Sequence, residues 1–119
     1  MKLKELLQIL HGRGLQNDAL ICSSVADLEA RLCREVFGTA APLTEQDYTL
    51  PAAAERKLLL GADDLELYAE YALAQEHLSR GEGPAYNTAL QAAQQRLGQV
   101  AARCRKQKRP PKISLNYWS

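Results

Sequence analysis

One stretch near the C-terminus restricts the possible fold more than any other part of the sequence. Between Tyr86 and Cys104, apolar or small residues recur at alternating steps of four and three positions. This spacing is the a and d pattern of a helix that packs lengthwise against other helices. The residues of this heptad seam are Tyr86, Leu90, Ala93, Leu97, Val100 and Cys104. We therefore expect an all-α fold in which the rest of the chain packs on this helix.

Length and composition agree with a small helical domain. A chain of 119 residues suits one domain, and its 6% aromatic residues favour helix packing over a β-sheet. No run approaches the roughly 18 to 20 apolar residues that cross a bilayer, so we expect no membrane association. Three cysteines without a CxxC motif indicate a reducing compartment, and we predict a cytoplasmic location.

The seam helix is expected to form the second arm of an antiparallel hairpin. Gly81 to Pro84 combines a helix stop with a helix start, which predicts helices at 62–80 and 84–106. Asp63 and Glu66 resemble a capping box for the first of them. Small residues flank the seam and predict close approach of a neighbouring helix: Ala89, Ala92, Gly98, Ala101 and Ala102. The opposite face is expected to be solvated and carries Gln91, Gln94, Gln95, Gln99 and Arg103.

Shorter helices are predicted upstream, giving a bundle of about five. Leucines at helical spacing indicate a helix over 2–11, and a second apolar stripe runs from Ile21 to Val36. Ser23 and Ser24 leave open a break within that second helix. Pro51 suits the first turn of a helix over 51–60. We predict a single helical domain over 1–107 and a basic, aromatic and partly extended tail over 108–119.

Charge is distributed very unevenly along the chain. Residues 1–82 hold 8 Lys or Arg and 14 Asp or Glu, whereas residues 83–119 hold 7 Lys or Arg and no acid. The net charges are therefore −6 and +7, which describes an acidic body with a basic arm. Six cations lie within ten residues: Arg103, Arg105, Lys106, Lys108, Arg109 and Lys112.

This basic arm predicts contact with the phosphate backbone of DNA or RNA, and Tyr117 and Trp118 just beyond it suit base stacking. The competing interpretation is that cations near a helix C-terminus complement the helix dipole. Two or three cations would serve that purpose, and this arm has six. Our first hypothesis is a non-enzymatic nucleic-acid-associated accessory or regulatory protein. A helix-turn-helix over 1–37 is disfavoured, because its third helix would be acidic.

A protein partner is the alternative. Beyond Pro110 and Pro111, Ile113, Leu115 and Tyr117 alternate with polar residues, which is typical of a segment that adds a strand to another protein. The second hypothesis is therefore an adaptor, inhibitor or chaperone that docks a larger protein through this tail and its acidic body. The seam also permits packing on a second copy, so a homodimer is an open prediction.

No catalytic residue, cofactor or metal ion is predicted. His11, Cys22 and Cys33 are each eleven residues apart, whereas zinc sites begin with closely spaced ligand pairs. Nothing in the sequence brings His77 or Cys104 to a nucleophile or base partner.

Overall fold

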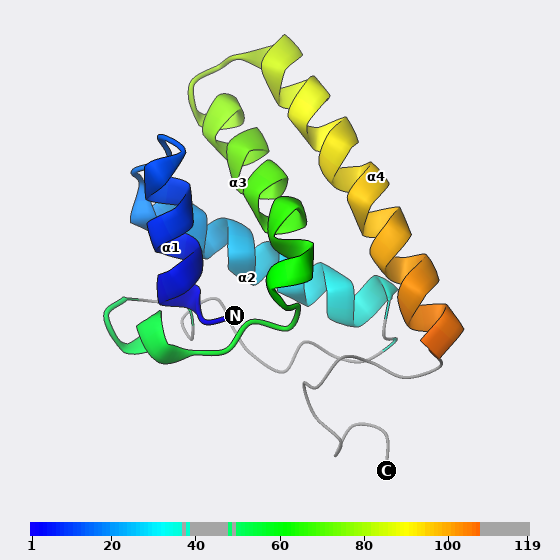
Figure 1. Cartoon of the computed structure of the whole chain (residues 1–119). Coiled ribbons are helices and arrows are strands. Elements are labelled where there is room, and N and C mark those ends of the chain that lie inside the picture. The colour runs from blue at the N-terminus through cyan, green and yellow to red at the C-terminus, as the bar shows by residue number, and fades with distance from the viewer. Residues whose placement is uncertain (37, 39–47, 49, 108–119) are drawn as a thin grey trace.

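The structure is a computed structural model that describes residues 1–36, 38, 48 and 50–107. Within these residues the chain is built from α-helices and contains no β-strand, which confirms the all-α prediction. The helices are α1 (Leu3–Gly12), α2 (Asp18–Glu35), α3 (Leu65–Ser79) and α4 (Gly83–Gln107), with 3-10 turns at Ala52–Glu55 and Ala62–Asp64 (Figure 1).

The core is centred on α3 and not on the seam helix. In Figure 1, α3 lies between α1 and α4, and α2 crosses the other helices. Buried residues surround much of α3: Leu67, Tyr68, Ala69, Tyr71, Ala72 and Ala74. On α4 the seam is buried at Ala93, Val100 and Cys104, and it is half-buried at its other three positions. The seam is therefore used mainly for contacts within the chain, with α4 at the edge of the bundle.

Helices α3 and α4 run in opposite directions and are held in register by two ion pairs. Arg96 bonds Glu70 at 2.8 Å, and Arg103 bonds Asp64 at 2.9 and 2.7 Å. The partners are six positions apart on α3 and seven apart on α4, which is the spacing of two antiparallel helices that stay in contact over two turns. This places the C-terminal half of α4 beside the beginning of α3.

The predicted helix over 51–60 is wrong. The 3-10 turn at Ala52–Glu55 ends at Arg56, and the following residues pair with the N-terminus of the chain. Leu58 N donates to Met1 O, and Leu3 N donates to Arg56 O, both at 2.9 Å. Leu58, Leu59 and Leu60 are buried as this extended segment crosses to α3. Backbone pairing with the N-terminus thus replaces the helix that Pro51 indicated.

The structure also settles one alternative that the sequence left open and corrects one local prediction. The possible break at Ser23 and Ser24 does not occur, because Ser24 Oγ donates to Leu20 O within a continuous α2. The capping box is absent at α3: Asp64 occupies the cap position without a side-chain bond to the backbone, and Glu66 bonds Arg13 instead. Glu66 is therefore used in a long-range ion pair, and Asp64, the residue after the predicted Asp63, takes the cap position and bonds Arg103.

Gly98 does not mark a close approach of another helix. Gly98 and Ala102 are exposed, and a Cβ added at Gly98 would have no atom within 4 Å. Among the small residues that flank the seam, Ala89 and Ala101 are buried. In the part of the chain that the structure describes, no helix has both the length and the apolar character needed to cross a membrane.

Candidate nucleic-acid interface

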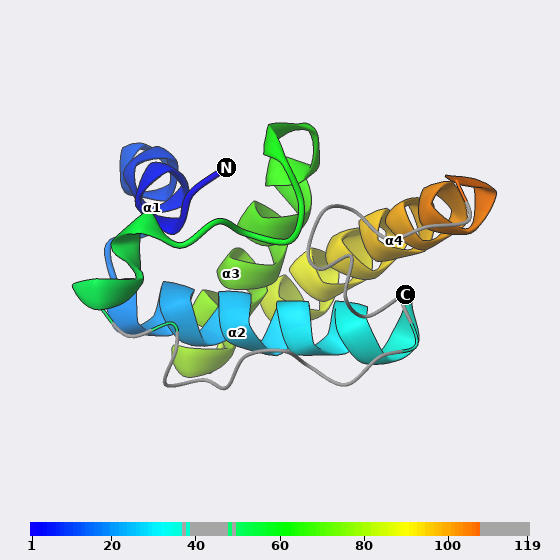
Figure 2. The same cartoon turned by 90° about the horizontal axis from the view of Figure 1, so that it is seen from below.

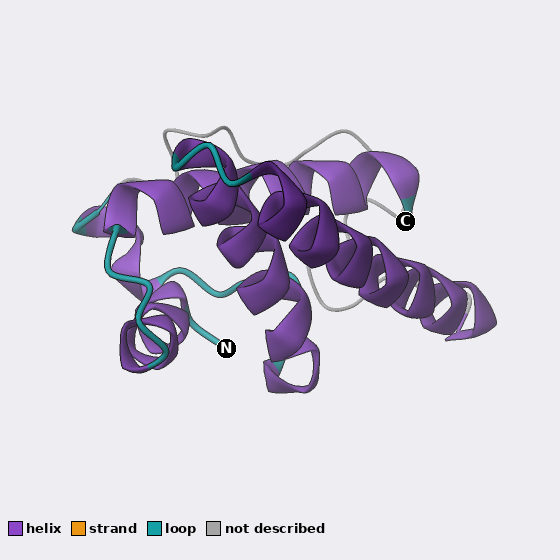
Figure 3. Ribbon diagram, turned by 90° about the horizontal axis from the view of Figure 1, so that it is seen from above, coloured by secondary structure: helices purple, strands orange, loops and turns teal. Residues whose placement is uncertain are grey.

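The predicted basic arm begins at the end of α4, where the helix extends away from α1 and α3 (Figures 2 and 3). Val100 and Cys104 are buried and attach this end of α4 to the core. Arg105 and Lys106 occupy backbone positions in the last turn of the helix. Lys108, Arg109, Lys112, Tyr117 and Trp118 lie outside the described residues. The structure therefore positions the start of the arm and does not test the rest of it.

Arg103 is already engaged within the protein. Both of its terminal nitrogens donate to the carboxylate of Asp64, whose side chain is only 11% exposed. Two parallel hydrogen bonds between a guanidinium and a carboxylate are among the stronger contacts available to arginine. Arg103, which sequence analysis placed in the basic arm, is thus positioned to anchor α4 to the beginning of α3.

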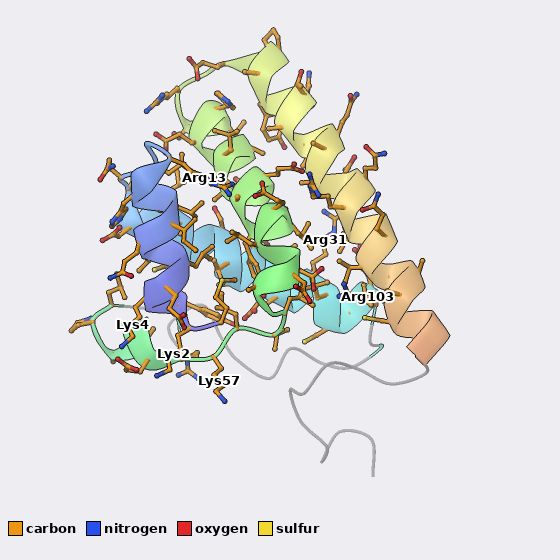
Figure 4. The ribbon with its side chains drawn as sticks, viewed as in Figure 1. Lys2, Lys4, Arg13, Arg31, Lys57 and Arg103 are labelled. Atoms are coloured by element: carbon orange, nitrogen blue, oxygen red, sulfur yellow. The ribbon has the colours of Figure 1, made fainter. Side chains whose placement is uncertain are left out.

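Most other cations of the body also have carboxylate partners, and Figure 4 labels several of them. Lys2 and Lys4 share Glu55, and Arg13 makes two bonds to Glu66. Arg31 pairs with Glu35, Arg80 with Glu76, and Arg96 with Glu70. The acidic residues of the body therefore neutralise its cations, whereas the sequence after Glu82 contains no acid.

The outward side of α4 carries an uncharged polar surface, which we call the amide face. Its members are all exposed: Asn87, Thr88, Gln91, Gln94, Gln95, Gly98, Gln99 and Ala102. At 100° per residue these positions fall within an arc of roughly 140°. The predicted solvent exposure of the four glutamines and Arg103 is confirmed.

The inner edge of α4 borders a shallow groove of mixed charge. This groove has a volume of about 300 Å³ and separates the beginning of α3 from α4. Asp63, Asp64 and Glu66 line one side, and Arg96 and Arg103 line the other. Gln99, at one edge of the amide face, also lines this groove, so the carboxylates of the groove border that edge of the face.

A buried carboxylate in α2 was not predicted from the sequence. Glu29 is 2% exposed, and it accepts hydrogen bonds from Tyr48 Oη at 2.6 Å, Tyr68 Oη at 2.7 Å and Leu59 N at 2.6 Å. Tyr68 Oη also accepts a bond from Leu60 N at 3.1 Å. Burial raises the pKa of Glu29, although the three donors oppose the shift. This network ties α2 to α3 and to the segment leading into it.

The histidines and cysteines do not assemble a reactive group in the described residues. His11 pairs with Asp18, and His77 pairs with Glu82 at 2.8 Å. Cys22 and Cys104 are buried, and burial raises the pKa of both thiols, which disfavours the reactive thiolate. Within the same residues, no three His, Cys, Asp or Glu side chains are grouped closely enough to hold a metal ion.

Comparison of the chain with models of protein families, with curated proteins and with solved structures gives no match.

Proposed function

We infer that this chain is a non-enzymatic nucleic-acid-binding protein, of an accessory or regulatory kind, that holds the phosphate backbone through its C-terminal arm. The observation that carries this proposal is the separation of charge: every acid of the chain precedes Gly83, and five cations follow Cys104. Contacts of cations with phosphates supply affinity and do not select a sequence.

The ion pairs of the body support this assignment. Because Arg96 and Arg103 bond carboxylates of α3, the positive charge on the inner edge of α4 is balanced locally. The arm has no acidic residue of its own to balance it, so its cations are the part of the chain best suited to neutralise phosphates.

Copurification tests the proposal directly. The full chain is expressed, purified at low salt, and its absorbance at 260 and 280 nm is compared with that of an arm variant in which Arg105, Lys106, Lys108 and Arg109 are replaced by alanine. We expect nucleic acid on the wild type, its release by salt, and none on the arm variant. Nucleic acid bound equally to both proteins would contradict the proposal.

A protein partner is the second candidate, and the alternating apolar residues after Pro111 favour it. A clean absorbance spectrum with a stoichiometric protein companion would replace the first proposal with this one. Binding of a protein through an aromatic anchor resists salt and is lost with Trp118→Ala. Binding to phosphates weakens steeply as salt rises and is lost in the arm variant. A homodimer through the heptad seam is not favoured, because the seam residues that are buried already pack within the chain.

A further inference from the structure

The amide face lacks the charged side chains that the exposed side of a helix usually carries. Between Asn87 and Ala102, each exposed position of α4 is uncharged, and five of them carry an amide side chain. A solvated face needs no such restriction, and charged residues are the commonest choice there. The exposed positions of α2, in contrast, include Asp27, Arg34 and Glu35.

The face continues into the basic arm. Arg105 lies seven positions after Gly98, and Lys106 lies four positions after Ala102, so the helical register brings both backbone positions onto the same side of α4. From Asn87 to Lys106 this side extends for about 29 Å. The face holds no carboxylate of α4; it borders Asp63, Asp64 and Glu66 only at the edge formed by Gln99, and the two basic positions lie at its C-terminal end.

The polarity of the face argues against a second copy of the chain as its occupant. Interfaces between identical subunits have an apolar core and bury more than roughly 1,200 Å². The amide face has no large apolar side chain, since the exposed large apolar residues in the described part of the chain are Ile9, Leu73 and Leu78 on α1 and α3. Nucleic-acid interfaces are, in contrast, polar.

The shape and chemistry of the face select among nucleic acids. Single strands are held by stacking on aromatic side chains, and the amide face contains none. The major groove of A-form RNA is too narrow for a helix, whereas the major groove of B-DNA is about 12 Å wide and admits one. Glutamine and asparagine are also the side chains that pair with the N6 and N7 atoms of adenine in that groove.

We propose that the amide face of α4 enters the major groove of duplex DNA and that Gln91 and Gln95 contact adenine edges there. The proposal rests on the proposed function, because the arm supplies the affinity through flanking phosphates. Gly98 and Ala102 lie beside the two glutamines in the middle of the face, and Gly98 has open space above it. The absence of large side chains there lets the helix backbone come close to the bases.

The test is a selection followed by binding measurements on the full chain. A 30-base-pair duplex pool with a randomised centre is selected against the wild type, and affinity is then measured for the selected duplex, a scrambled duplex and the single strand. Variant Gln91→Ala/Gln95→Ala is compared with Gln8→Ala/Gln75→Ala, which removes two amides from α1 and α3. We expect the first pair to lose about tenfold or more in affinity for the selected duplex only, and the second pair to be unchanged.

Two further variants guard against unfolding as the cause. Gln95→Glu keeps the shape of the side chain and adds a negative charge to the amide face, and Gln8→Glu adds the same charge elsewhere. We expect Gln95→Glu to weaken duplex binding and Gln8→Glu to leave it nearly unchanged, with the same thermal melting by circular dichroism for both.

The outcomes separate this inference from the proposed function. If binding depends on the arm but no duplex sequence is enriched, or if the face variants bind as the wild type does, the inference fails and the proposed function stands. If the wild type binds no nucleic acid, both fail. If sedimentation shows a dimer that Gln95→Glu dissociates, a second copy covers the face and the inference is overturned.

Discussion

Arg103 near the end of α4 donates two hydrogen bonds to Asp64 at the beginning of α3, at 2.9 and 2.7 Å. This pair lies between the part of the chain whose cations are paired with carboxylates and the part whose sequence holds cations but no acid. The pair thus marks where the acidic body ends and where the proposed nucleic-acid-binding arm begins.

Removing this pair is expected to weaken folding more than binding. Arg103→Ala should lower the free energy of unfolding by about 1 kcal/mol, the upper end for a half-exposed ion pair, because the geometry is bidentate. Urea denaturation of the single variants and of the double variant with Asp64→Ala gives the coupling energy. Additive effects of the two substitutions would show that the pair contributes nothing to stability.

Glu29 should tolerate an amide but not a truncation. Glu29→Gln keeps an oxygen for Leu59 N and Tyr68 Oη, and Tyr48 Oη can accept a bond from the new amide nitrogen. Glu29→Ala leaves three buried donors without their acceptor and should cost about 3 kcal/mol or more. Denaturant unfolding measures both, and an equally large loss in the glutamine variant would contradict the account.

The same carboxylate predicts a pH effect with a definite sign. Burial raises the pKa of Glu29 above its usual 4.5, so the folded chain holds this proton more tightly than the unfolded chain. The resulting stabilisation is complete below pH 4.5 and is lost as pH rises through the raised pKa. Relative to Glu29→Gln, the wild type should therefore gain stability as pH falls from 7 toward 4.5.

The comparison with Glu29→Gln is needed because other carboxyls act in the opposite direction. Bonds from Lys4 and Lys2 lower the pKa of Glu55 to about 2, and its effect on stability is therefore lost as pH falls. Glu55 is present in both proteins and cancels in the difference. A stability difference that does not vary with pH would contradict the role of burial at Glu29.

Gly98→Ala should stabilise the protein by about 1 kcal/mol. Glycine is the less favourable residue inside a helix by this amount, and the added Cβ meets no atom within 4 Å. Thermal or urea unfolding of the variant checks the expectation. A destabilised variant would mean that another helix or a second copy occupies the space above Gly98. Ala102→Ser serves as a control, because it adds one atom to the same face.

The spacing of apolar residues predicts where most of the helices lie. The apolar composition of a helix indicates which one lies at the centre of the fold. The heptad seam located α4, but spacing alone does not say how many neighbours a helix has. The sequence of α3 carries apolar residues on most sides, from Leu65 through Ala74, and a helix with that composition is usually central. The composition of α3 is therefore a feature of the sequence that indicates its central position.

Only part of the candidate site could be predicted, because some of its contacts join residues that are far apart in the sequence. The basic arm is visible as a run of cations, and the exposure of the glutamines follows from the register of α4. The engagement of Arg103 was not predictable, because Asp64 is 39 residues away. The burial of Glu29 was indicated only by helical spacing. Glu29 lies four residues after Val25 and three before Leu32, so it shares their buried side of α2.

The central claim is tested most directly by the salt dependence of binding to a 30-base-pair duplex. Neutralisation of one phosphate by each of five cations, Arg105, Lys106, Lys108, Arg109 and Lys112, gives a slope of log affinity against log salt of about −4.5. The arm variant should bring the slope close to −1. A control with four exposed body cations replaced, Lys4, Arg34, Lys57 and Arg80 to alanine, should keep the wild-type slope. Equal slopes for the wild type and the arm variant would contradict the account.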